Sequence, residues 1–137
     1  MIARVDDAGL VTVASAHPVS ETADRLAAAA EAAGMRVFAR VDHAAGAAEA
    51  GMPLRPTELL LVGNPRGGTP LMQDRQTAGL DLPLRVLAWE DAGGRVWVTT
   101  NDTAWLAARH GLGEASVAAT SAVSAGLARI VTEATAG

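Results

Sequence analysis

The segment Thr57–Asp91 constrains the fold more than any other part of the chain. A hydrophobic run stops at the Gly/Pro-rich stretch GNPRGGTP (63–70), and a second hydrophobic run further on ends in two carboxylates. Thr69 followed by Pro70 is a favoured helix start, because threonine can cap the first turn and proline lacks an N–H that would stay unpaired there. The segment therefore predicts a strand, a turn, a short helix and a strand.

Short β-branched or alternating runs predict strands on both sides of this segment as well. Strands are expected over residues 10–14, 36–42, 58–62, 84–90 and 95–100. Two helical patterns, between Ser20 and Gly34 and over Ser116–Thr135, place small and apolar residues on one face. Two such helices can cover one face of an antiparallel sheet. We therefore predict a single two-layer α+β domain over residues 1–137, with a five-stranded antiparallel sheet, helices on one face and the order β-α-β4-α.

Composition narrows the classes of partner. Half of the 137 residues are apolar, and the net charge of −4 disfavours nucleic acid, since phosphate binding needs a basic surface. The absence of cysteine excludes disulfides and thiolate metal sites. The N-terminus lacks a signal-peptide pattern, and no stretch reaches the ~20 apolar residues of a membrane span. We expect a cytoplasmic protein with no cofactor and no membrane partner.

Five segments carry motifs whose joint spacing is specific. They are FARVDHAAGA (38–47), LRPTELLLVGNPRGGTPLMQ (54–73), LDLPLRVLAWED (80–91), VWVTTND (96–102) and RHGL (109–112). Together they resemble the prokaryotic family called domain of unknown function 302, over nearly the whole chain. The resemblance implies a β-α-β4-α fold of the TATA-binding-protein-like type that usually forms dimers. It brings no established activity.

His43 and Glu90 are the candidate catalytic residues. His43 follows a predicted strand, and an imidazole there could act as a general base, because its usual pKa lies near neutrality. The alternative is that His43 bonds to the backbone and fixes the exit of the chain from the sheet. Glu90 could face the helices or the open side of the sheet. Glu90 together with Arg55 or Arg109 could assist His43 electrostatically. These residues would give a small cofactor-free enzyme.

The stretch GNPRGGTP has two interpretations. Glycines before a helix N-terminus, with Arg66 beside them, could bind an anion. The Walker pattern is absent, however, and a structural turn is the favoured interpretation. Asn64, Arg66, Arg55 and Arg109 are kept as candidate ligand-binding residues, although Arg109 is also expected to cap the end of a helix.

Trp89 and Trp97 complete the candidate ligand-binding set. They lie directly opposite each other, on one face of a hairpin, if the loop between them has three residues, Ala92–Gly94. On an uncovered face they would form a dimer surface or a ligand platform; the alternative is ordinary packing against helices. Asp91 is expected to form the turn.

We expect no metal site, because His17, His43 and His110 have no HxH or HxxxH spacing. The favoured function is a homodimeric module that binds a small, partly apolar ligand or a protein partner. The cofactor-free enzyme based on His43 is the alternative.

Overall fold

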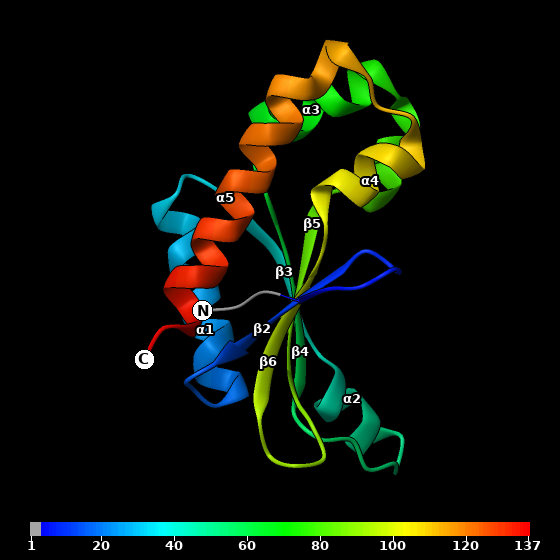
Figure 1. The fold of residues 1–137 in the computed structure, drawn as a ribbon. Coiled ribbons are helices and arrows are strands. Elements are labelled where there is room, and N and C mark those ends of the chain that lie inside the picture. Colours follow the sequence, from blue (N-terminus) through cyan, green and yellow to red (C-terminus); the bar gives the residue numbers. More distant parts are fainter. Residues whose placement is uncertain (1–3) are drawn as a thin grey trace.

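The structure is a computed structural model that describes residues 4–137. An antiparallel sheet of six strands runs through it in the order β1-β2-β6-β5-β4-β3 (Figure 1). The strands are β1 Arg4–Val5, β2 Leu10–Ser15, β3 Arg36–Asp42, β4 Thr57–Gly63, β5 Leu84–Glu90 and β6 Val96–Asn101. The helices are α1 Val19–Ala32, α2 His43–Glu49, α3 Pro65–Asp74, α4 Thr103–His110 and α5 Val117–Thr135, with the 3-10 turns η1 Gln76–Asp81 and η2 Glu114–Ser116. The predicted α+β class is confirmed.

The predicted number of five strands is wrong, because a short strand precedes the first predicted one. The Asp6 carboxylate accepts hydrogen bonds from the N–H groups of Ala8 and Leu10, at 3.0 and 2.9 Å, and so closes a tight turn. This turn brings β1 back antiparallel to β2. With only two residues, β1 is too short to show a hydrophobic pattern.

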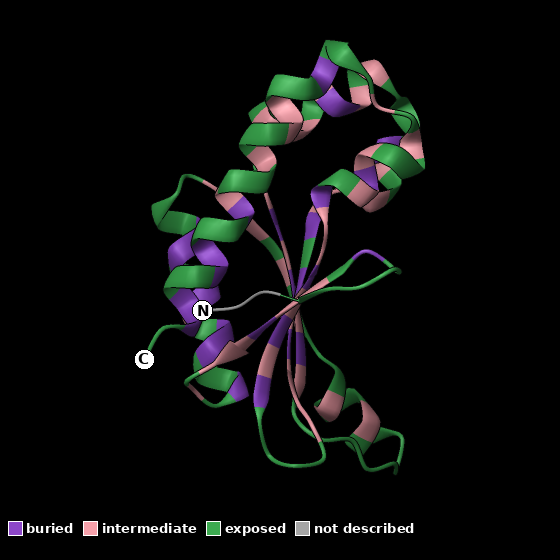
Figure 2. Ribbon diagram, in the orientation of Figure 1, coloured by how far each residue is buried: buried purple, intermediate pink, exposed green. Residues whose placement is uncertain are grey.

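The core lies between the sheet and the two long helices, α1 and α5, which share one side of it (Figure 1). Every second residue of β4 is buried, and these residues appear as purple bands in Figure 2. Ala23, Leu26 and Ala30 of α1 are fully buried at 0% exposure. Their small side chains let the helix pack closely on the sheet.

The other face of the sheet is mostly uncovered. The short helix α2 packs against β4 and lies away from α1 and α5 in Figure 1. Elsewhere on this face, large apolar side chains are only partly buried; they include Leu59, Leu61, Leu87, Trp89 and Trp97. The long helices therefore cover one face, and the opposite face keeps an apolar surface.

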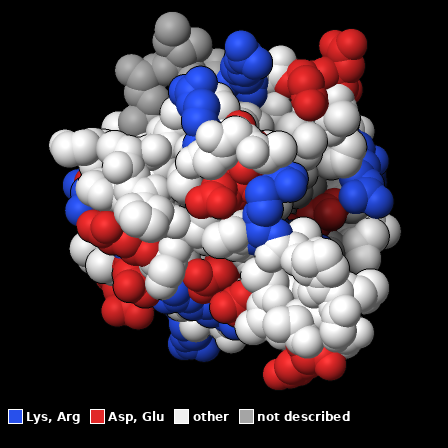
Figure 3. Space-filling model, turned by 90° about the horizontal axis from the view of Figure 1, so that it is seen from below, with Lys and Arg blue, Asp and Glu red and all other residues white. Residues whose placement is uncertain are grey.

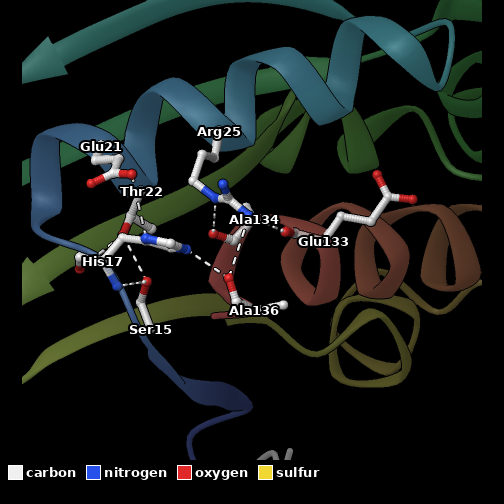
Figure 4. Close-up of polar contacts among 8 residues, drawn as sticks. All are labelled: Ser15, His17, Glu21, Thr22, Arg25, Glu133, Ala134 and Ala136. Carbon is white, nitrogen blue, oxygen red and sulfur yellow. Dashed lines mark hydrogen bonds and ion pairs between the residues drawn. The ribbon is translucent and has the colours of Figure 1, made fainter.

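Side chains from α1 and from the turn before it hold the end of α5 (Figure 4). Arg25 donates from Nε to the Ala134 carbonyl at 3.0 Å and from Nη2 to the Glu133 carbonyl at 3.2 Å. His17 Nε2 lies 2.6 Å from the Ala136 carbonyl. The last carbonyls of a helix lack partners within it, so these contacts satisfy them and fix the end of α5.

Beyond the end of the sheet, α3, η1, α4, η2 and the first half of α5 form an arch (Figure 1). Asp81 of η1 accepts hydrogen bonds from Arg109 and is bonded to His110 of α4. Asp74 of α3 accepts from the Gly113 N–H at 2.9 Å and from the Ser116 hydroxyl at 2.7 Å. These two hydrogen bonds hold the pKa of Asp74 below its usual value. Two carboxylates thus brace the arch.

Candidate functional site

An apolar cavity of about 490 Å³ lies where the arch leaves the sheet. Its walls come from the end of α1, the adjoining ends of β3, β4 and β5, and the facing sides of α3 and α5. The larger apolar side chains in the lining are Met35, Phe38, Met72, Leu82, Pro83, Leu84 and Val123. Polar side chains in the lining are Asn64, Thr69 and Arg129. A cavity of this size with few polar groups is typical of small-molecule sites.

Four glycines also line the cavity: Gly63, Gly67, Gly68 and Gly126. None of them has the positive φ that demands glycine. A Cβ at Gly67 would lie 3.5 Å from Val123, and one at Gly68 would lie 3.4 Å from Leu82, both ordinary contact distances. At Gly126 the nearest atom is the mobile tip of Met35, at 3.1 Å. Neither the backbone nor close packing therefore requires glycine at 67 or 68, and the absence of side chains there leaves space in the cavity.

Within the stretch GNPRGGTP, Gly63 ends β4, and residues 65–70 already form the first part of α3 rather than a turn before it. The helix begins at Pro65 with Asn64 as N-cap, so the predicted start with Thr69 as cap and Pro70 at the first position is wrong. The Asn64 side chain accepts a hydrogen bond from the Arg66 N–H at 2.9 Å. The backbone carbonyl of Asn64 accepts hydrogen bonds from the N–H groups of Gly67 and Gly68. Asparagine is as good an N-cap as threonine, and here it competes successfully. Because these first N–H groups have partners, they are not free for an anion.

The predicted catalytic residues lie at the opposite end of the sheet from the cavity. His43 is the first residue of α2 and is exposed; the preceding Asp42 caps the helix by accepting from Ala45. Glu90 ends β5 opposite Val96, which places it on the helix-covered side, and its carbonyl accepts from Arg55 Nε at 3.1 Å. Neither His43 nor Glu90 lines the cavity. Figure 3 views the molecule from this end and shows acidic and basic side chains interspersed.

The two tryptophans of the hairpin meet on the uncovered face. Trp89 pairs directly with Trp97, and their ring centroids are 6.5 Å apart. The Asp91 N–H bonds to the Arg95 carbonyl at 2.8 Å, which leaves the three-residue loop that the prediction required. Trp97 Nε1 donates to the Asp91 carboxylate at 2.9 Å, and this bond is the main cause that lowers the pKa of Asp91. Trp89 Nε1 donates to Thr99 Oγ1.

Histidines and acidic residues do not assemble a metal site within residues 4–137. His17 bonds at the end of α5, His43 begins α2, and His110 lies between Asp81 and Thr77 in the arch. Arg109 shares Asp81 with His110, so both residues of this pair brace α4 against η1.

Sequence reasoning found only part of the cavity. Asn64 was a candidate and lines it, whereas Arg66, Trp89, Trp97 and Arg109 do not. Lining residues that were not candidates include Met35, Phe38, Met72, Val123 and Arg129. Glycine inside the helical pattern of the last segment, at 126, was the one available signal, because glycine lowers helix stability unless it has another role.

Known proteins share this architecture. The family model described as domain of unknown function DUF302 matches residues 11–134. The crystal structure of an uncharacterized conserved DUF302 protein from Bacillus stearothermophilus superposes with a TM-score of 0.82 at 18% identity, covering 92% of this chain and 98% of that one. At this identity the structural likeness establishes the fold alone.

Curated relatives carry a more specific name. The chain is 59% identical over 125 residues to Fluoride-specific ion channel FluC 1 of Brucella suis biovar 1 (strain 1330), covering 91% of this chain and 49% of the relative. Fluoride-specific ion channel FluC 2 of Brucella melitensis biotype 1 is equally similar, with 46% of its length covered. The chain thus spans about half the length of the curated relatives it matches.

One helical stretch in the described part of the chain, Glu114–Thr135, is long and apolar enough to cross a membrane. It is not a continuous apolar run, because it includes Glu114, Arg129 and Glu133. Leu127, Ile130 and Val131 of this stretch pack in the core. Core helices meet the same criterion of length and composition, so the stretch is weak evidence for a membrane span.

Proposed function

Because the chain belongs to the DUF302 family, whose function is unknown, we propose a function from its cavity: it binds a small, mainly apolar molecule. The site is the space of about 490 Å³ between α3, α5 and the end of the sheet. Burial of a ligand's apolar surface there supplies the binding free energy, at about 0.8 kcal/mol per methylene group. The flexible side chains of Met35 and Met72 let the walls adjust to the ligand.

The glycines are the observation that carries this proposal. Gly67 and Gly68 lie in the first turn of helix α3, where glycine is less favourable than alanine, by at most about 1 kcal/mol each. An alanine methyl group would fit at either position at ordinary contact distance. Open space for a ligand accounts for glycines that cost stability without serving the fold.

A cavity-filling variant tests the proposal. Gly67→Met places a side chain in the cavity, and we expect octanol to bind at least about tenfold more weakly than to wild type, the equivalent of about two lost methylene contacts. Gly46→Met is the matched control, because Gly46 is also helical but has no neighbouring atom within 4 Å of an added Cβ. Isothermal titration calorimetry measures both, and thermal unfolding checks that both fold. Equal octanol affinity in all three proteins, or none in wild type, would contradict the proposal.

We also propose that the chain is a homodimer through the uncovered face of the sheet. Val41 and Leu10 there are each 39% exposed, and Leu59, Leu61, Leu87 and the two tryptophans are half-buried. An apolar patch of this kind on a single chain is typical of an interaction surface. Six antiparallel strands provide a broad, regular surface that a second copy can match by two-fold symmetry.

A second candidate function is that of a domain that works with a membrane fluoride channel. Its support is the 59% identity to about half of each protein named a fluoride-specific ion channel. The unmatched half of those relatives has room for the channel itself. We expect the purified chain alone to give no fluoride efflux from liposomes, and to be retained on channel-containing liposomes but not on empty ones. Efflux from the chain alone, or no retention, would remove this candidate.

A further inference from the structure

The cavity has apolar walls and a charged residue at its exposed edge. Its walls are hydrocarbon and thioether groups, among them Met35, Met72, Leu82 and Val123. The amide of Asn64 is already engaged, since its Oδ1 accepts from Arg66 and its Nδ2 donates to the Gly34 carbonyl at 3.3 Å. The interior therefore favours a ligand body without polar groups, because an unpaired polar group is costly to bury.

Charge enters the lining at one residue, Arg129 of α5. Its Nε donates to Glu133 at 3.2 Å, one helical turn on, and its side chain is 74% exposed. A guanidinium has five N–H donors, so the Glu133 contact through Nε leaves the other donors for a ligand. The guanidinium of Arg129 therefore has more N–H donors than its ion pair with Glu133 uses.

A second arginine contacts another residue of the lining. The guanidinium of Arg36 lies over the ring of Phe38, 5.5 Å from its centroid, and Phe38 lines the cavity. Arg36 itself lines a neighbouring hollow together with Glu31, and this hollow shares Met35 and Asn64 with the cavity. Glu31 lines this hollow together with Arg36, and Glu133 forms an ion pair with Arg129.

We propose that the ligand is an amphiphile with an aliphatic body and an anionic end, such as a medium-chain carboxylate, with the anionic end at Arg129. This inference rests on the proposed function and adds the class of ligand. The start of α3 does not provide the anion site, because its first N–H groups bond to Asn64. Arginine pairs with a carboxylate through two parallel N–H donors, a geometry that an alcohol cannot match.

Three ligands of equal chain length test the aliphatic body and the anionic end of the proposed ligand separately. Calorimetry with octanoate, octanol and octylamine should give affinities in that order, with octanoate about fivefold tighter than octylamine, a modest factor because Arg129 is exposed to solvent. Arg129→Gln should abolish the preference for octanoate and keep octanol binding. Arg66→Gln is the matched control, since Arg66 lies on α3 but does not line the cavity.

The outcomes are distinguishable. Equal affinity for the three ligands, or a preference that survives Arg129→Gln, overturns the anionic end and leaves the apolar site intact. Failure of all three ligands to bind overturns the proposed function together with this inference. A loss of preference in Arg66→Gln equal to that in Arg129→Gln overturns the assignment to Arg129.

Discussion

Gly9 shows how a single residue can determine the packing of two elements. Its φ of +78° closes the turn before β2, and its carbonyl accepts from the Asp102 N–H at 2.7 Å. An added Cβ would lie 2.3 Å from Cγ of Trp105 in α4. Glycine is therefore required here by both the backbone and the indole.

We expect Gly9→Ala to lower the free energy of unfolding by more than about 2 kcal/mol, from left-handed strain plus the displaced indole. Gly34→Ala is the control, because Gly34 has a φ of +81° but open space around it. It should cost only the strain, about 1 kcal/mol. Urea unfolding measures both, and equal losses would show that the Trp105 contact is unimportant.

Asp91 is expected to make the stability of the fold depend on pH. Bonds from Trp97, Arg95 and Gly93 lower its pKa in the folded protein. A lowered pKa stabilises the fold fully above the unfolded value of about 4, and this contribution is lost as pH falls through the folded pKa. Asp91→Asn should therefore be less stable than wild type at neutral pH, and the difference should shrink in acid. Thermal unfolding across this range would contradict the assignment if the difference stayed constant.

At the scale of elements, the sequence predicted long periodic segments well and capping choices poorly. The strands at 36–42 and 84–90 match β3 and β5 to the residue. The apolar run of β5 reflects its burial, whereas β3 has no buried residue and was recognised by alternation alone. The start of α3 was misplaced because Asn64 and Thr69 are both good caps, and only the packing of the whole helix selects between them. Strand β1 was missed because pairing, not pattern, defines it.

Arg40 of β3 connects this strand to β4 and α1, and its removal is expected to destabilise the fold. It pairs with Glu58 of β4 at 2.8 Å and with Asp24 of α1 at 2.6 Å, and these two carboxylates raise its pKa further. The Glu58 side chain is only 11% exposed, so Arg40→Ala leaves a carboxylate almost without solvent. We expect a loss of about 2 kcal/mol, less than for a fully buried pair because Arg40 is partly exposed.

The double variant Arg40→Met with Glu58→Leu is the control for this prediction. It should recover most of the loss, since no poorly exposed charge is left unpaired and Asp24, the other partner of Arg40, is 66% exposed. Urea unfolding provides the comparison. If Arg40→Ala alone were neutral, the Glu58 carboxylate would have to be hydrated in solution.

At the scale of the whole molecule, the uncovered sheet face predicts the oligomeric state. Leu87→Lys puts a charge in the centre of this face and should convert a dimer into monomers, because an unpaired charge is costly to bury at an interface. Val117→Lys is the control, since Val117 is 61% exposed but lies on α5. Light scattering after size-exclusion chromatography measures the mass, and a monomeric wild type would contradict the homodimer.

The site was the least predictable part of the molecule, because it depends on how the whole chain packs. The sequence pointed to polar residues such as His43 and Glu90, because chemistry is easiest to recognise in polar side chains. The cavity is instead built from Met35, Met72 and glycines, whose only common property is the space that the tertiary fold leaves between them. Packing of α3 over α5 creates that space, and Gly126 is the one local signal of it in the sequence.

The central claim, that this cavity binds an apolar molecule, is tested most directly by NMR of methyl-labelled methionine during titration with octanol. Met35 and Met72 line the cavity, whereas Met52 is 61% exposed elsewhere and serves as an internal control. The account predicts saturable shifts of the Met35 and Met72 methyl signals with Met52 unchanged. Unchanged Met35 and Met72 signals, or a shift of Met52 alone, would contradict it.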